Sequence, residues 1–346
     1  MRKRCLIGTA ILFITLMTTG CTEEVVVPTP EMPEESDRIQ IGITFDTFVL
    51  ERWIRDRDVF VYTAQGLGAD VDVQNANGNI DRQIQQIEEF IYQRKDVIVI
   101  VAVDSFGLRD VVNQANNASI PVISYDRLIQ NAKSDLYITV NSEMVGEAMA
   151  EVVKERLPEG GNVVMITGPE TDANSRLVAG GFKGFLEGTN VRIIDETPVQ
   201  AWTSEYGFLA AHEALENHDN IDAIMSGNDG LAGFVIQALS ERQLAGQIIV
   251  TGQDADIEAC QRIVEGTQTM TVYKPIETLA ARAAEFAVML ALGEELTEVT
   301  ETMENTIGEI PFFGLKPTAV TIDNIEEVIL ESGFHLREDV FRNVSF

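Results

Sequence analysis

The chain has 346 residues, of which 45% are hydrophobic and 23% are charged, a composition typical of a globular protein of about two domains. It carries 55 acidic and 25 basic residues, for a formal net charge of −30. Because such a charge repels phosphate backbones, we expect no nucleic acid among its partners.

The first 37 residues predict an export signal followed by a tether. Residues 1–20 carry three basic residues at positions 2–4, continue with an apolar stretch and end in small residues, the order typical of a secretory signal. The end of this segment is similar to a bacterial lipoprotein signal, so we expect Cys21 to be lipidated, with plain secretion as the alternative. Residues 21–37 are rich in proline and glutamate, which predicts a solvated tether. We therefore expect a periplasmic or extracellular protein that meets the membrane only through a lipid anchor.

The cysteines predict a fold without disulfides. Cys5 lies in the predicted signal, and a lipidated Cys21 leaves Cys260 alone in the folded body. No intrachain disulfide framework can then form, so the hydrophobic cores have to hold the fold together.

From residue 38 onward, short β-branched runs alternate with amphipathic segments, which indicates an α/β protein with parallel sheets. A first series of strands is expected at 40–45, 70–74, 97–101, 121–125 and 137–140, and a second at 162–167, 191–196, 223–226, 248–251 and 269–273. Parallel strands need crossovers, and these cover both faces of a sheet with helices. We therefore predict two α/β halves, each a doubly wound parallel sheet.

Polar side chains follow most of these strands. In such folds, ligands bind outside the carboxyl ends of the strands, so these positions are the first candidates for a binding site. In the first half they are Asp46, Asp104, Asp126, Arg127 and Asn141, and in the second half Asp172, Asn174, Asn228, Asp229, Asp254 and Lys274.

These residue types suit a neutral sugar, which offers hydroxyls in fixed directions and an apolar ring face. Carboxylates to accept hydrogen bonds, cations to donate them, amides to do both and aromatic plates are all present: Asp126, Asp172, Asp254, Arg52, Arg127, Lys274, Asn174, Asn228, Trp53 and Trp202. Asp46 and Asp104 are further strand-end candidates. The alternatives are helix capping for an aspartate after a strand, and core packing for Trp53.

Catalytic and metal-binding motifs are not evident. The histidines lack the spacing of a helical metal pair, and no phosphate-binding glycine loop or nucleophile elbow follows a strand. We therefore expect no cofactor, no metal and no enzymatic activity.

Several motifs carry a resemblance to a known family. They are Leu50-Glu51-Arg52-Trp53, Tyr125-Asp126-Arg127, Ser226-Gly227-Asn228-Asp229, Gly252-Gln253-Asp254-Ala255-Asp256 and the stretch from Gly266 to Pro275. With them, the chain from about Ile41 to Phe334 resembles the periplasmic sugar-binding proteins of ABC importers, and within these the ribose/xylose-binding class.

The resemblance implies a type I periplasmic binding protein fold, in which two lobes are joined by a three-segment hinge and the sugar lies between them. It places an N-terminal lobe at 38–141 plus 276–312 and a C-terminal lobe at 142–275 plus 313–346. The family's ligand-contacting positions fall on the ten residues chosen above from the strand ends and aromatic plates.

The function implied is capture of a monosaccharide, D-xylose or a related sugar, for delivery to an ABC permease. One alternative is a sensor that presents sugar occupancy to a chemoreceptor or sensor kinase. Another is a sugar-processing enzyme on the same fold. A transcriptional regulator is disfavoured, because the chain has a secretory signal and no N-terminal helix-turn-helix.

Overall fold

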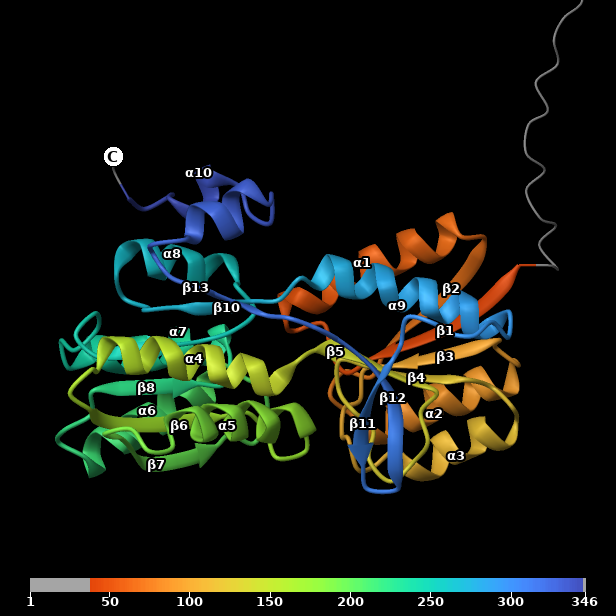
Figure 1. The fold of residues 1–346 in the computed structure, drawn as a ribbon, viewed down its shortest axis with the longest axis horizontal. Coiled ribbons are helices and arrows are strands. Elements are labelled where there is room, and N and C mark those ends of the chain that lie inside the picture. The colour runs from red at the N-terminus through yellow and green to blue at the C-terminus, as the bar shows by residue number, and fades with distance from the viewer. Residues whose placement is uncertain (1–37, 345–346) are drawn as a thin grey trace, which may run out of the picture.

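The computed structural model describes residues 38–344, so the predicted signal at 1–20, Cys21 and the tether at 21–37 lie outside the described residues. Within residues 38–344, the strands form a seven-stranded sheet in the order β11-β12-β5-β4-β3-β1-β2, a four-stranded sheet in the order β7-β6-β8-β9, and the pair β10-β13. We call the part built on the seven-stranded sheet the first lobe, and the part built on the other two sheets the second lobe (Figure 1).

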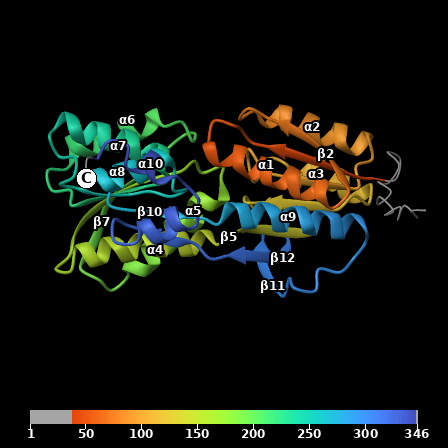
Figure 2. The ribbon, with the colours of Figure 1, turned by 90° about the horizontal axis from the view of Figure 1, so that it is seen from above.

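The first lobe has a parallel sheet with helices on both faces. Its elements are β1 (Ile39–Phe45), α1 (Glu51–Gly66), β2 (Ala69–Asn75), α2 (Ile80–Tyr92), β3 (Val97–Ile100), α3 (Arg109–Asn117), β4 (Val122–Tyr125), β5 (Leu136–Val140), α9 (Ile276–Ala291), β11 (Glu301–Asn305) and β12 (Gly308–Leu315). Strands β1 to β5 pair in parallel. Helices α1 and α9 lie side by side on one face, and α2 and α3 cover the other (Figures 1 and 2).

The second lobe repeats this plan around a smaller sheet. Its elements are α4 (Ser142–Arg156), β6 (Gly161–Thr167), α5 (Ala173–Leu186), β7 (Val191–Pro198), α6 (Glu205–Asn217), β8 (Ala223–Ser226), α7 (Asp229–Glu241), β9 (Ile249–Thr251), α8 (Ile257–Glu265), β10 (Thr271–Tyr273), β13 (Thr318–Val320), a π-helical turn (Glu326–Glu331) and α10 (Arg337–Val340). Helices α4 and α5 pack together on one face, and α6 and α7 on the other (Figure 2). The predicted fold class, an α/β protein with parallel sheets, is confirmed.

Two glycines let α4 and α5 approach closely. A Cβ on Gly146 of α4 would lie 1.9 Å from the carbonyl oxygen of Val178, and one on Gly181 of α5 would lie 2.0 Å from that of Glu143. No larger residue fits either position without moving one helix, so this contact fixes one face of the second lobe.

Three chain crossings join the lobes (Figure 1). They run from β5 to α4 through Asn141, from β10 to α9 through Lys274 and Pro275, and from β12 to β13. Strand β12 pairs with β5 as far as Leu315, so the hydrogen-bonded part of the first lobe extends past residue 312, the boundary expected from the sequence.

The structure differs from the expected sheets in two places. The segment expected as a fifth parallel strand of the second half, 269–273, becomes β10, which pairs antiparallel with β13. Hydrogen bonds from the Thr269 N–H to the Val250 carbonyl and from the Val272 N–H to the Gly252 carbonyl, both 3.0 Å, still hold this segment beside the end of β9. The hairpin β11-β12, which the sequence analysis did not predict, extends the first sheet.

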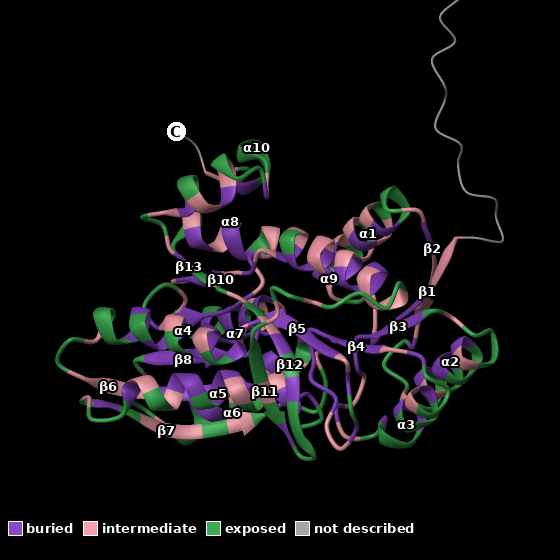
Figure 3. Cartoon of the chain, turned by 45° about the vertical axis from the view of Figure 1, so that its right-hand side comes forward, coloured by how far each residue is buried: buried purple, intermediate pink, exposed green. Residues whose placement is uncertain are grey.

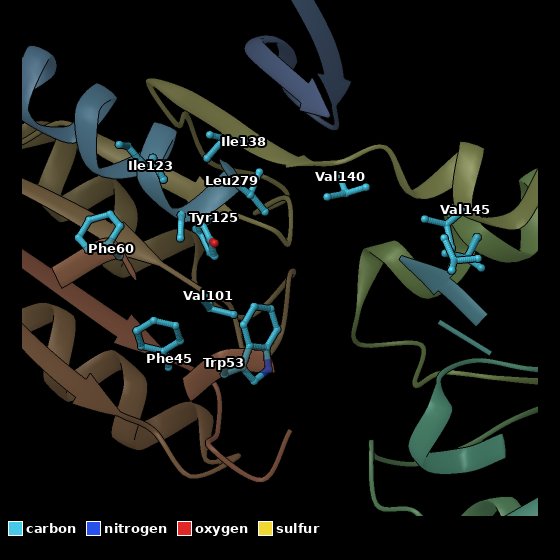
Figure 4. Packing of buried hydrophobic residues seen from close by; sticks show 14 of the residues in the cluster. Phe45, Trp53, Phe60, Val101, Ile123, Tyr125, Ile138, Val140, Val145 and Leu279 are labelled. Atoms are coloured by element: carbon cyan, nitrogen blue, oxygen red, sulfur yellow. The ribbon is translucent and has the colours of Figure 1, made fainter. Parts of the chain in front are cut away.

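The central strands of both sheets are buried (Figure 3). The largest hydrophobic cluster runs from the first sheet through Val140 and then Val145 of α4 into the second lobe, and Trp53 lies at the edge of the first lobe that faces the second (Figure 4). Cys260 of α8 is a free, buried thiol, and burial raises its pKa. None of the helices in the described part of the chain combines the length and apolar character needed to cross a membrane.

Candidate functional site

A cavity lies between the two lobes. Its empty space, including open solvent at the mouth, is about 510 Å³. Ten of its lining residues are the ten predicted from the sequence: Arg52, Trp53, Asp126, Arg127, Asp172, Asn174, Trp202, Asn228, Asp254 and Lys274. They come from both lobes and from one chain crossing, so residues more than two hundred positions apart share one wall.

The strand ends bring these side chains together. Asp126 and Arg127 directly follow β4, Asp254 follows β9, and Lys274 follows β10 at the crossing to α9. Asp126 has a φ of 63°, a left-handed conformation that turns the chain sharply at the end of the strand. These residues therefore lie at the carboxyl ends of the strands, where the sequence predicts a ligand site.

Arg52 is the cationic centre of the first-lobe wall. Its Nη2 donates to Asp126 Oδ2 at 2.8 Å, and its Cζ lies 4.2 Å from the centre of the Trp53 ring. Burial would lower the pKa of Arg52, but the carboxylates of Asp126, Asp56 and Asp254 raise it above its ordinary value. Arg52 is therefore a permanent donor in this site.

Direct contacts between the lobes cross the cavity wall. Arg127 Nε forms an ion pair with Asp172 Oδ2 at 2.8 Å, and Arg52 Nη1 lies 3.5 Å from Asp254 Oδ1. Asn174 Nδ2 donates to the backbone oxygen of Asp126 at 2.9 Å and to its Oδ1 at 3.1 Å. The structure is therefore a closed arrangement, in which the polar groups of one lobe meet those of the other.

Two site residues also cap helices. Asp172 Oδ1 accepts from the backbone N–H of Asn174 at the start of α5, and its Oδ2 accepts from Trp202 Nε1 at 3.0 Å. Asn228 Oδ1 accepts from the backbone N–H of Leu231 at the start of α7. Capping and a place in the site are thus not alternatives here, because one side chain does both with different atoms.

The two tryptophans of the chain line the cavity from opposite lobes. Trp53 is only 1% exposed and is 6.3 Å from Phe45 between ring centres, so it is part of the core and of the cavity wall at once. Trp202 lies against two glycines, because a Cβ on Gly168 would come within 2.2 Å of its ring and one on Gly227 within 3.2 Å. Small residues here leave room for an aromatic plate.

The carboxylates of the site differ in their electrostatic surroundings. Burial alone would raise the pKa of Asp126, but Arg52, Lys274 and Arg127 hold it below its ordinary value. Burial raises the pKa of Asp172 although Arg127 lies beside it. Lys274 Nζ pairs with Asp254 Oδ1 at 3.0 Å. The site therefore offers charged acceptors and donors side by side in a buried setting, where hydrogen bonds are strong.

Buried polar atoms around the cavity point to a polar occupant. Among the described residues, Arg52 Nε, Trp53 Nε1, Ser175 Oγ and Gln253 Oε1 are buried without a hydrogen-bond partner, and all four side chains line the cavity. An unpaired buried polar group costs free energy, so a ligand with hydroxyls would stabilise this wall. Ser175 and Gln253 were not predicted. Gln253 directly precedes Asp254, and the strand-end rule could have found it.

The two further candidates lie beside the cavity. Asp46 does not line it, but its Oδ2 accepts from Arg127 Nη1 at 2.7 Å and so holds that arginine from within the first lobe. Asp104 does not line it either: its Oδ1 accepts from the backbone N–H of Phe106 and forms a turn. Asp46 is therefore placed to act through Arg127, and Asp104 through the loop it shapes.

That loop makes a second contact between the lobes, which we call the rim contact (Ser105, Phe106, Thr171 and Arg176). The Ser105 N–H donates to the Thr171 carbonyl at 3.0 Å. The Arg176 guanidinium lies 4.6 Å from the centre of the Phe106 ring. None of the four lines the cavity, so the lobes are also held together away from any ligand.

Within residues 38–344, no group of three or more histidine, cysteine, aspartate or glutamate side chains is arranged to hold a metal ion. What the cavity can do is bind a small polar molecule through fixed donors and acceptors, between two aromatic rings.

Comparisons with known proteins agree with this geometry. The family model of the periplasmic binding protein domain matches residues 41–295. A D-xylose-binding periplasmic protein of Haemophilus influenzae is 40% identical over 311 residues, 88% of this chain and 93% of that protein. One of Escherichia coli is 37% identical over 330 residues, 94% and 98% of the two chains.

A solved ABC transporter solute-binding protein from Clostridium phytofermentans with bound β-D-glucose has the same fold. It is 26% identical, with a TM-score of 0.79, and the match covers 87% of this chain and 99% of that one. The resemblance carried by the sequence motifs is confirmed: the chain belongs to the periplasmic binding protein family.

Proposed function

We propose that this chain is an extracytoplasmic solute-binding protein that captures D-xylose in the cavity between its lobes and delivers it to an ABC permease. The proposal of xylose is supported by the two relatives of 40% and 37% identity, both of which are named for this sugar. Delivery to a permease is supported by the family and by the transporter protein of similar fold.

The observation that carries the proposal is the meeting of both lobes at one buried polar wall. Asp126, Arg127 and Arg52 of the first lobe contact Asn174, Asp172 and Asp254 of the second. A hydrogen bond to a charged group is worth about 1.5–3 kcal/mol, and micromolar affinity needs about 8 kcal/mol net. Three or four such bonds to a sugar supply about 4.5–12 kcal/mol before the cost of association, a range that includes this value.

The mechanism is capture without chemistry. A sugar enters when the lobes are apart, and closure brings second-lobe side chains onto its hydroxyls. A ligand shifts this equilibrium only by binding the closed form more tightly than the open one, so the sugar has to contact both lobes. The closed form is then what the permease recognises.

Calorimetric titration with D-xylose, D-ribose, L-arabinose and D-glucose tests the proposal. We expect D-xylose to bind most tightly, with a dissociation constant of about 1 µM or below, and to be recovered unaltered after incubation. Asp254→Asn is expected to abolish measurable binding while the fold is retained. Asp323→Asn, at an exposed second-lobe carboxylate, is the matched control and should bind as the wild type does.

Two results would reject the proposal: no binding of any of the four sugars, or conversion of the sugar during incubation. Unchanged affinity in Asp254→Asn would reject the assigned site.

We also propose that the mature protein is held at the membrane by a lipid on Cys21. Radiolabelled palmitate should be incorporated by the full chain and not by Cys21→Ser. Release of an unlabelled wild-type protein into the soluble fraction would instead indicate plain secretion.

A further inference from the structure

We propose that Asp56 is a positioning residue for sugar capture: its carboxylate, held by Tyr125, keeps the Arg52 guanidinium aimed into the cavity when the lobes are apart. The inference rests on the proposed function, since it concerns how that site is kept ready for its ligand.

The geometry places Asp56 behind Arg52. Both lie on α1, one helical turn apart, and Arg52 Nη2 is 3.7 Å from Asp56 Oδ1. Asp56 is 1% exposed, and its Oδ1 accepts from the Tyr125 hydroxyl. Tyr125 is the last residue of β4 and directly precedes Asp126, so one strand end supplies both the group that fixes Asp56 and the acceptor for Arg52.

Asp56 is the acidic neighbour of Arg52 that a ligand does not reach. Opening of the lobes takes Asp254 away from Arg52, because Asp254 belongs to the second lobe. A sugar hydroxyl can compete for Asp126, which lines the cavity, but Asp56 does not line it. Asp56 therefore stays opposite Arg52 in the open, closed and sugar-bound forms. A donor held in its binding position loses less conformational freedom when the ligand arrives.

The charge of Asp56 is sensitive to pH in the range where the protein can be studied. Burial raises its pKa to about 6, against the opposing effects of Arg52 and Tyr125. Its Oδ2 is buried with no hydrogen-bond partner among the described residues, which is consistent with a carboxyl that readily takes up a proton.

The other charges near α1 have their own partners. The titratable and charged groups that face Asp56 are Arg52 on α1 and Tyr125 and Asp126 on β4. On α9, which packs along α1, Glu277 pairs with Arg55 at 3.4 Å. On β2, Asp70 and Asp72 pair with Arg38 and Lys95.

The test is the pH dependence of D-xylose affinity, measured by calorimetry from pH 5 to pH 8. In the wild type we expect affinity to fall about tenfold as Asp56 is protonated, the loss of one favourable charge interaction at the donor. Asp56→Asn keeps the shape and an acceptor for Tyr125 but removes the charge. It should bind about tenfold more weakly than the wild type at pH 7.5 and show little change down to pH 5.

Tyr125→Phe is the second variant, and it separates positioning from simple loss of packing. It keeps the Asp56 charge but removes the hydrogen bond that lowers the pKa of Asp56, so the midpoint of the pH profile should move upward. Asp58→Asn, an exposed carboxylate on the same helix, is the matched control and should reproduce the wild-type profile.

The inference is overturned if Asp56→Asn binds as tightly as the wild type at pH 7.5, or if its affinity falls with pH in parallel with the wild type. It is also overturned if Tyr125→Phe leaves the midpoint in place. These outcomes differ from failure of the proposed function, in which the wild type itself binds no sugar at any pH.

Discussion

The Nε atom of Arg127 and the Oδ2 atom of Asp172 are 2.8 Å apart, although the two residues belong to different lobes. Both side chains are buried, at 3% and 5% exposure. Arg127 has a second carboxylate, Asp46, within its own lobe, and Asp172 has the Trp202 N–H within its own. Each partner therefore keeps a polar neighbour when the lobes separate, and the pair can form and break without leaving a bare buried charge.

Asp172→Asn is expected to weaken D-xylose binding by about 10- to 100-fold, mainly through faster dissociation, because it removes a buried charge opposite Arg127. The fold should be kept, since asparagine also caps helices well. Stopped-flow dissociation and calorimetry measure both parts. Glu216→Gln, at an exposed carboxylate of α6 in the same lobe, is the control, and an equal loss there would argue against a role for the interlobe pair.

Tryptophan fluorescence is expected to report sugar binding directly, because both tryptophans of the chain line the cavity. The emission change should be half-maximal at a free sugar concentration equal to the dissociation constant found by calorimetry. Trp53→Phe and Trp202→Phe should each retain part of the change. Trp202→Phe should also bind about 3- to 10-fold more weakly, because it loses the N–H donated to Asp172. Binding by calorimetry without any emission change would place the sugar elsewhere.

Gly168→Ala is expected to lower the affinity at least about tenfold, because the new methyl would lie 2.2 Å from the Trp202 ring and 2.4 Å from Ser175 Oγ. The Trp202 ring and the Ser175 hydroxyl, whose side chains both line the cavity, would have to shift. Gly180→Ala, in α5 of the same lobe, meets nothing within 4 Å and should bind normally, with a small gain in stability from better helix propensity. Equal affinities for the two variants would contradict this account of the Trp202 plate.

The rim contact is expected to contribute to closure without touching the ligand. Arg176→Gln removes the cation over Phe106, an exposed interaction worth about 0.5–1 kcal/mol. Affinity for D-xylose should therefore fall about 2- to 5-fold. Lys154→Gln removes a similar contact to Phe185 within one lobe and should leave the affinity unchanged. An equal loss of affinity in both variants would contradict a contribution of the rim contact to closure.

Unfolding free energy is expected to fall as pH rises toward neutrality, because burial raises the pKa of Asp229 to about 7 in the second lobe. The folded state then holds a proton that the unfolded chain, with an ordinary carboxyl pKa of 3.8, has released. The contribution of Asp229 to the free energy of unfolding is complete below pH 4. It is lost as the pH rises from there through 7. Between pH 5.5 and pH 8, urea unfolding of the sugar-free protein should show a loss of roughly 2 kcal/mol.

Asp229→Asn should reduce this pH dependence, whatever its effect on absolute stability, and the part that remains should include the contribution of Asp56, whose pKa is raised to about 6. Asp229 Oδ1 accepts from Gln268, and Oδ2 accepts from Thr271, so the variant also alters hydrogen bonds and its stability has to be compared with itself across pH. A profile in the variant as steep as in the wild type would assign the effect to other carboxyls.

The residues chosen by the strand-end rule lie together because a parallel sheet brings its carboxyl ends to one edge. Asp126, Asp172, Asn228 and Asp254 each follow a strand or begin the next helix, and all line the cavity. Asp104 shows the limit of the rule, since a short aspartate side chain after a strand can equally well bond the backbone two residues on. Nothing in the sequence separates these outcomes.

Long-range pairings could not be predicted in the same way. The hairpin of β11 and β12 contains exposed glutamates and Pro311, so it lacks the β-branched pattern that identified the other strands. Strand β13 has three residues, too short for any periodicity, so the antiparallel partner of β10, a strand expected within 269–273, could not be identified. Asp56 lies one turn after Arg52 and would have been found by asking which residue shares its helix face.

The isolation of Cys260 inside α8 makes the molecule convenient for single-molecule work. A buried thiol whose pKa is raised by its surroundings reacts poorly with maleimides. When the protein is expressed without residues 1–21, Cys5 and Cys21 are absent. Two cysteines introduced at exposed positions, for example at Tyr92 and Leu209, can then carry a donor and an acceptor dye with little labelling of Cys260. The distance between the dyes then records each opening and closing event as sugar comes and goes.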